Sequence, residues 1–261
     1  MNKIKKQIII LQLMALIIGG YGCEMKKEKV KQEPTLNEWQ KEFLEEQGLP
    51  TEYSELNLTQ QLSVDAIYEM IMYLEEKYGI GFEYTGYVRP QILEKEYMTA
   101  IPEGGNAKTD TVTVTREDDG TFTDDYPNIA VRPYYEQMVT DYVKDYFNSD
   151  KIMVSASVSR STLECINKDS KNVQIYDVGA STVIFIDNNI CSESQINDFA
   201  KILGQWLQEN KLCGVTQLIL LNKNVEVNNI TQDNFRDFLS TEKYSERINI
   251  SIQGNQEINI Y

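Results

Sequence analysis

The clearest hydrophobic patterning lies in the C-terminal half of the chain. An unbroken apolar run at residues 183–186 predicts a central strand, and residues 217–221 predict a second buried strand. Between them, apolar residues recur at helical spacing behind Ser192, which stands where a helix N-cap would stand. The pattern therefore predicts a strand, a helix over residues 192–210 and another strand in succession.

Further strands flank this unit. Residues 152–158 alternate between apolar and mostly small polar side chains, which predicts a strand buried mainly on one face. Residues 248–252 and 258–260 alternate on either side of a Gly-Asn pair, a sequence typical of β-hairpin turns. A short helix over residues 231–240 is expected before the hairpin.

The N-terminal half begins with two expected helices. Capping-box spacing at residues 35–38 starts the first helix, and Gly48 closes it. The second is expected from Ser63 to Gly79 on its stripe of apolar residues, and a strand at residues 82–88 follows directly.

Two more elements are expected before the C-terminal half. Period-two alternation at residues 111–115 predicts an edge-type strand. Pro133 suits the first turn of a third helix, which places Tyr135, Tyr142 and Tyr146 on one side. These tyrosines could present rings to a sugar, but their helical spacing favours a face at the boundary of the core.

Together these elements predict an α+β fold class, with amphipathic helices packed on one or more mixed sheets as an α/β sandwich. We expect an N-terminal α+β subdomain over residues 35–149 and a C-terminal α/β subdomain over residues 150–261.

The first 22 residues have the pattern of an export signal. Lysines lie near the start, an apolar run covers residues 8–18, and Gly20-Tyr21-Gly22 precedes Cys23. A bilayer span needs roughly 20 apolar residues, so we expect this stretch to be removed rather than retained. An ordinary secretory signal followed by a chance cysteine is the alternative.

The sequence Gly20-Tyr21-Gly22-Cys23 resembles the lipobox of bacterial lipoprotein signal peptides. The resemblance implies that residues 1–22 are cleaved and that the Cys23 thiol carries a diacylglycerol. It also implies that the mature chain is held at the extracytoplasmic face of the cell membrane, where two acyl chains give stable anchoring. Residues 23–34 are charged and aperiodic and would form a tether. Residues 74–79 look generally like other small Gram-positive lipoproteins of unassigned function.

Composition excludes several functions. With 25 basic and 40 acidic residues, the chain has a formal net charge of −15, so phosphate backbones repel it and no nucleic-acid partner is expected. The same charge opposes binding to anionic lipid headgroups, so the acyl anchor would have to hold the chain at the membrane. The sequence has no histidine, which excludes Ser-His-Asp and Cys-His catalysis and His-ligated metal sites.

Two stretches carry candidate chemistry. The acidic residues 116–125 could form a calcium loop, but their spacing does not fit an EF-hand, so a solvated turn is favoured. Residues 240–243 match a Ser-x-x-Lys pattern without the other motifs of penicillin-interacting enzymes, which indicates a chance match. No catalytic residue, cofactor or metal ligand is therefore predicted.

Besides Cys23, the chain has Cys165, Cys191 and Cys213. A helix is expected between Cys191 and Cys213, and its length would hold their Cα atoms beyond the roughly 7 Å that a disulfide allows. Cys165 could pair with either, or all three could be buried thiols.

Three functions remain open. The first is a lipid-anchored extracytoplasmic protein that binds or scaffolds without catalysis, with the membrane and a cell-envelope protein as partners. The alternative is a cell-wall glycan hydrolase that uses paired carboxylates. The third is a solute-binding component of an importer.

Overall fold

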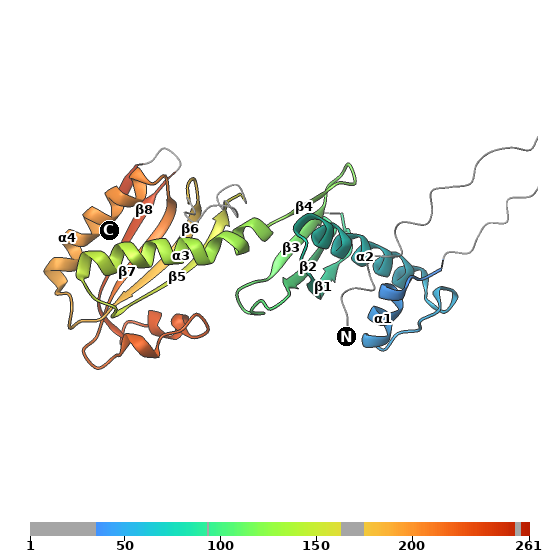
Figure 1. Cartoon of the computed structure of the whole chain (residues 1–261), viewed down its shortest axis with the longest axis horizontal. Coiled ribbons are helices and arrows are strands. Elements are labelled where there is room, and N and C mark those ends of the chain that lie inside the picture. Colours follow the sequence, from blue (N-terminus) through green and yellow to red (C-terminus); the bar gives the residue numbers. More distant parts are fainter. Residues whose placement is uncertain (1–34, 93, 163–174, 254–256) are drawn as a thin grey trace, which may run out of the picture.

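The structure is a computed structural model that describes residues 35–92, 94–162, 175–253 and 257–261. The described residues form four α-helices and two β-sheets, which confirms the predicted α+β fold class (Figure 1). The leader, the tether, Cys23, Cys165 and the Gly254-Asn255 turn lie outside the described residues.

Two helices and an antiparallel sheet form the N-terminal half. The helices are α1 (Glu38–Glu46) and α2 (Leu58–Tyr78). The strands run in the order β1 (Phe82–Val88), β2 (Tyr97–Pro102), β3 (Val112–Arg116) and β4 (Phe122–Asp124). The apolar stripe of α2 packs on this sheet, so Met70, Leu74 and Val114 are fully buried in one core cluster.

The C-terminal half is built on a mixed sheet. Its strands run in the order β5 (Ile152–Arg160), β6 (Gly179–Ile186), β7 (Cys213–Leu221), β8 (Tyr244–Ile252) and β9 (Ile258–Ile260). Strands β6 and β7 are parallel and are connected through α4 (Glu193–Glu209), whereas the other neighbours are antiparallel. The predicted strand–helix–strand succession is confirmed.

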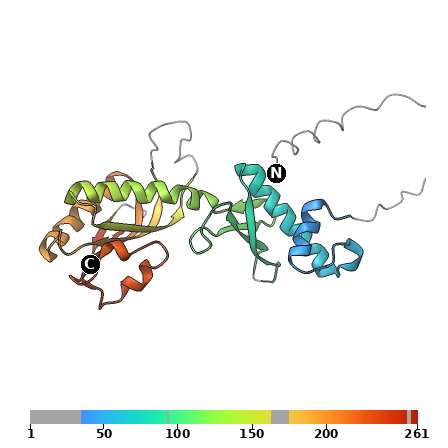
Figure 2. The ribbon, with the colours of Figure 1, turned by 60° about the horizontal axis from the view of Figure 1, so that its bottom comes forward.

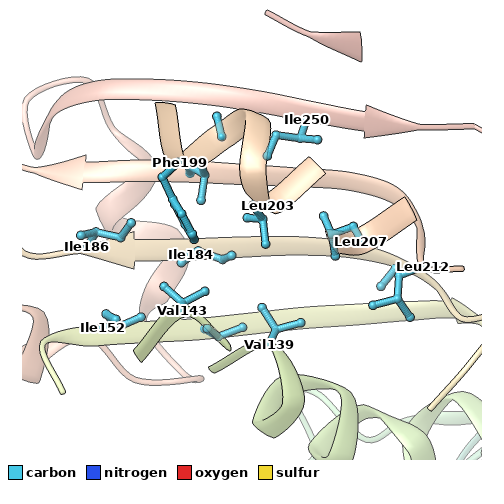
Figure 3. Close-up of a cluster of buried hydrophobic side chains, with 14 of the residues drawn as sticks. Val139, Val143, Ile152, Ile184, Ile186, Phe199, Leu203, Leu207, Leu212 and Ile250 are labelled. Carbon is cyan, nitrogen blue, oxygen red and sulfur yellow. The ribbon is translucent and has the colours of Figure 1, made fainter. Parts of the chain in front are cut away.

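Helices α3 (Tyr126–Phe147) and α4 cover one face of this sheet. Val143 of α3 and Phe199 and Leu203 of α4 point into the core above the strands, where all three are fully buried (Figure 3). Part of the opposite face is covered by residues 222–243, which include two 3-10 helices (Figure 2). These are η4 (Val227–Asn229) and η5 (Phe235–Leu239).

Helix α3 connects the two halves (Figure 1). Its first turn contributes Tyr126 and Ile129 to the N-terminal core, whereas its four buried residues belong to the core of the C-terminal half: Val131, Tyr135, Val139 and Val143. The proposed subdomain boundary near residue 149 stays a prediction, but most of the core contacts of α3 belong to the C-terminal half.

Three predicted helix starts are wrong. The capping box of α1 is formed by Asn37 and Gln40 and not by residues 35 and 38. Helix α2 begins at Leu58, because Asn57 and Gln60 form a capping box ahead of Ser63. Helix α3 begins at Tyr126 and runs through Pro133. A proline removes one helical hydrogen bond, but buried residues on both sides of Pro133 hold the helix in place.

The structure also corrects two strand and helix assignments. Strand β3 lies between β2 and β4, so the predicted edge position of residues 111–115 is wrong. Residues 231–240 form turns and the short 3-10 helix η5 instead of an α-helix. Asn234 explains part of this, because its side-chain oxygen accepts from the backbone N–H of Thr231 at 2.7 Å and its backbone N–H donates to the Thr231 carbonyl.

Candidate binding site

A pocket of about 410 Å³ opens on the part of the C-terminal sheet that the helices leave uncovered. Four segments line it: the loop before β3, the first half of α3, strands β5 to β7, and the region of η5. A volume in this range suits a small-molecule ligand.

The floor of the pocket is polar. Ser155 and Ser157 of β5 lie beside Ser181 of β6, and Ser157 and Ser181 are direct cross-strand partners. Gln217 of β7 is paired with Val183, the next residue of β6 on the same face as Ser181. Side chains one residue apart along a strand point to opposite faces, so the serines face the pocket while Val154 lies in the core.

The opposite wall is partly apolar. Phe235 and Leu239 of η5 line it and are half-buried, and they pack with Val183, which lies on the floor between its strand partners Ser155 and Gln217. These three residues belong to the small core cluster beneath residues 222–243. The wall is thus fixed by burial rather than by the short helix alone.

Hydrogen bonds hold the loop before β3 at the mouth of the pocket. Arg132 of α3 donates to the Thr109 carbonyl at 2.7 Å and to the Asp110 carboxylate at 2.6 Å. The Asn106 side chain donates to Asp233 at 2.9 Å, which joins this loop to the η5 region. Burial raises the pKa of Asp110, but hydrogen bonds from Asn106, Thr109 and Arg132 outweigh it and hold the pKa below its usual value.

Two side chains cover part of the free edge of β5. The backbone N–H of Ala156 donates to Glu136 at 2.7 Å, and Gln232 donates to the Val154 carbonyl at 3.1 Å. Burial raises the pKa of Glu136. These bonds satisfy backbone groups that an edge strand would otherwise leave open, and they fix both sides of the pocket.

The lining carries three cationic side chains in a strongly acidic chain. It includes Lys108, Arg132 and Arg236 and no acidic residue. Arg132 is paired with Asp110, whereas Lys108 and Arg236 have no carboxylate partner among the residues that the structure describes. Arg236 lies over the ring of Phe235, with its guanidinium carbon 5.7 Å from the ring centroid.

A second hollow bears on the glycan hydrolase alternative. It lies beside α1 and β1, and Trp39 and Phe43 line it together with Glu42, Glu46 and Glu83. All three carboxylates are exposed to solvent. The general acid of a glycosidase normally sits in a desolvated pocket, so this hollow has the residue types but not the surroundings of such a site.

Residues 117–121 of the acidic stretch form the turn between β3 and β4, which confirms the favoured interpretation for them, whereas residues 122–124 form β4. The side chain of Asp124, near the end of this stretch, is fully buried and forms an ion pair with Lys77. Within the described part of the chain, no group of three His, Cys, Asp or Glu side chains could hold a metal ion.

The three tyrosines of α3 take part in packing. Tyr135 is buried and its hydroxyl lies 2.8 Å from that of Thr182, while Tyr142 stacks on Trp206 with ring centroids 4.1 Å apart. Tyr146 is more exposed but contacts Phe199. The core interpretation is confirmed for Tyr135 and Tyr142.

The described cysteines and the Ser-x-x-Lys residues do not come together in a site. Cys191 is buried, Cys213 is half-buried, and both are free thiols, as the predicted separation of this pair requires. Burial raises the pKa of the Cys191 thiol to about 11. The Ser-x-x-Lys residues form a turn, in which the backbone N–H of Lys243 donates to the Ser240 carbonyl.

Sequence patterning missed the pocket. The alternation at residues 152–158 does show a polar strand face, which was the available signal. Lys108 and Arg236 lie far apart in the sequence, on a loop and a 3-10 helix, and neither belongs to a motif.

Comparison with known proteins shows no family. No protein family profile matches the chain, and no curated protein does. Among solved structures, the chain is similar to a DUF5037 family protein from Ruminococcus gnavus ATCC 29149, at 12% identity and a TM-score of 0.36. The alignment covers 73% of this chain and 83% of the other. No helix within the described ranges is long and apolar enough to cross a membrane.

Proposed function

We propose that the chain is a lipid-anchored extracytoplasmic protein that acts as a non-catalytic binding module, with the serine-floored pocket as its binding site. Cys23 carries the lipid in this proposal, and residues 23–34 tether the folded part to the membrane. The sequence resemblance at Gly20-Tyr21-Gly22-Cys23 supports the anchor.

One observation carries the binding role. The pocket combines hydroxyl, amide and cationic groups with an apolar wall, and hydrogen bonds from α3 and η5 hold its rim in place. Preformed concave sites with a few convergent polar groups are typical of ligand binding. The lining offers neither a paired carboxylate nor a thiol, and the chain has no histidine to activate a serine.

The same pocket gives some support to a second function, the solute-binding component of an importer. Lys108 and Thr109 reach it from the N-terminal half, while the sheet residues come from the C-terminal half. Loss of solute uptake in cells that lack the protein would favour this function over a scaffold.

The test compares the wild type with a variant in which a tryptophan side chain fills the pocket. An extract of small molecules from cell envelopes of the producing bacterium should raise the melting temperature of the detergent-solubilised full chain. It should not raise that of Ser181→Trp, because the indole would occupy the floor of the pocket. Ser54→Trp, at an exposed position in the N-terminal half and outside this pocket, is the matched control and should respond like the wild type.

Two results would count against this function. One is an equal response of both tryptophan variants, which would move binding away from the pocket. The other is a repeatable hydrolysis of cell-wall glycan that a single change such as Glu83→Gln abolishes.

A further inference from the structure

Two of the three cationic side chains at the mouth of the pocket form no ion pair with a described carboxylate. Arg132 is neutralised by Asp110, but Lys108 and Arg236 face the same opening without a described carboxylate partner. Both side chains are exposed, so each retains its water until a ligand arrives. Asp110, Asp233 and Glu136 also lie against lining residues, so it is the exposure of the unpaired Lys108 and Arg236 at the opening, and not a net positive charge, that favours anions.

The floor specifies more than charge. Ser157 and Ser181 are cross-strand partners, so their Cβ atoms lie roughly 4.5–5.5 Å apart. Serine hydroxyls both donate and accept, and the Gln217 amide adds two donors and an acceptor. Hydroxyl and amide groups at this spacing can hydrogen-bond to a ring that carries several hydroxyls, whereas an apolar molecule would leave them without partners.

The third element is the ring of Phe235 beside Leu239. A sugar ring has an apolar face of C–H groups, which an aromatic or aliphatic wall can cover while the hydroxyls turn to the serines. The pocket volume of about 410 Å³ allows one or two such rings.

We propose that the pocket binds a small acidic sugar, with its anionic group at Lys108 and Arg236 and its hydroxyls on the exposed cross-strand pair Ser157 and Ser181. This proposal rests on the proposed function, because it takes the pocket as the binding site. The shared chemistry is a hydroxylated ring with a negative charge, which a uronate and a sugar phosphate both possess.

Calorimetric titration of the detergent-solubilised full chain with glucuronate, glucose 6-phosphate and glucose tests it. At least one of the anionic sugars should bind about tenfold or more tightly than glucose, and added salt should weaken that binding. Binding of glucuronate alone would identify a carboxylate ligand, and binding of glucose 6-phosphate alone would identify a phosphate.

Charge-removing variants complete the test. Lys108→Gln and Arg236→Gln should each weaken binding of the anionic sugar about tenfold and leave glucose unaffected. Lys201→Gln is the control, since this exposed lysine lies on α4 at the other face of the sheet.

The proposal is overturned if neither anionic sugar binds, if glucose binds as tightly, or if both pocket variants behave like Lys201→Gln. A pocket-dependent response to the envelope extract in the same preparation would then leave the proposed function standing. Only the ligand class would have failed.

Discussion

Asp124 shows how a single carboxylate can be structural in an acidic stretch that suggests metal binding. Its side chain is fully buried and accepts hydrogen bonds from Tyr73 and Tyr78 at 2.7 Å and from Lys77 at 2.6 Å. Burial alone raises the pKa of Asp124, but these hydrogen bonds outweigh it and lower the pKa below its ordinary value. The carboxylate thus fastens α2 to β4.

Replacing this group should destabilise the fold. Asp124→Asn should lower the free energy of unfolding by about 1–3 kcal/mol at pH 7, because the buried amide has only one oxygen to accept the hydrogen bonds of Tyr73, Tyr78 and Lys77. Urea unfolding of both proteins measures the difference. The exposed Asp118→Asn in the same turn is the matched control and should change stability by less than about 0.5 kcal/mol.

The stabilisation that Asp124 provides should depend on pH in one direction. The pKa of Asp124 is lower in the folded than in the unfolded chain, so its stabilisation is present above the unfolded value of about 3.9. It is lost as the pH falls through the folded pKa. The difference in free energy of unfolding between the wild type and Asp124→Asn should therefore become smaller in acid. A difference that grew as the pH fell would contradict this account.

Single residues also explain why sequence reasoning missed the candidate site. The serines of β5 indicate that one face of the strand is polar. Which side chains lie over that face depends on how the strands pair across the sheet. Arg132 and Asp110 meet only because α3 passes the loop before β3. Such long-range contacts have no local pattern in the sequence.

At the scale of elements, prediction succeeded where hydrophobic period and capping agree. Helix α4 is the clearest case, because Ser192 and Gln195 form a capping box ahead of a regular apolar stripe. The start of α2 failed because Leu58 and Leu62 are exposed, so its first turns carry apolar residues off the buried face. Strands β2 and β4 were missed because β2 lacks regular alternation and β4 has three residues.

One element junction depends on a glycine. Gly214 at the start of β7 has a φ of +115°, and a Cβ there would lie 2.0 Å from the carbonyl oxygen of Ala180 on the parallel neighbour β6. Gly214→Ala should therefore cost more than about 3 kcal/mol of unfolding free energy.

Gly81→Ala is the control for this glycine, because a Cβ there would meet only the flexible side chain of Glu103, at 3.4 Å or more. Thermal unfolding followed by circular dichroism compares the two variants. Equal melting temperatures would show that the β6–β7 contact is looser than described.

At the scale of the whole molecule, two sheets with separate cores are joined by α3 and by polar contacts around one pocket. Asn106 with Asp233 and Arg132 with Thr109 connect the N-terminal loop to the C-terminal half. The serine-floored pocket lies where these connections converge, so ligand binding there would also tie the two halves together. Lys108 and Arg236 are exposed cations at the mouth of this pocket in a strongly acidic chain.

We propose that the chain works outside the cytoplasm on a lipid anchor at Cys23. Cells that make the full chain, or its Cys23→Ser variant, should be grown with a palmitate analogue and then fractionated. We expect the wild-type chain to carry the label, to begin at Cys23 and to remain with the membrane, and the variant to carry no label. An unlabelled wild-type chain that still begins at Met1 and stays in the cytosol would contradict the account.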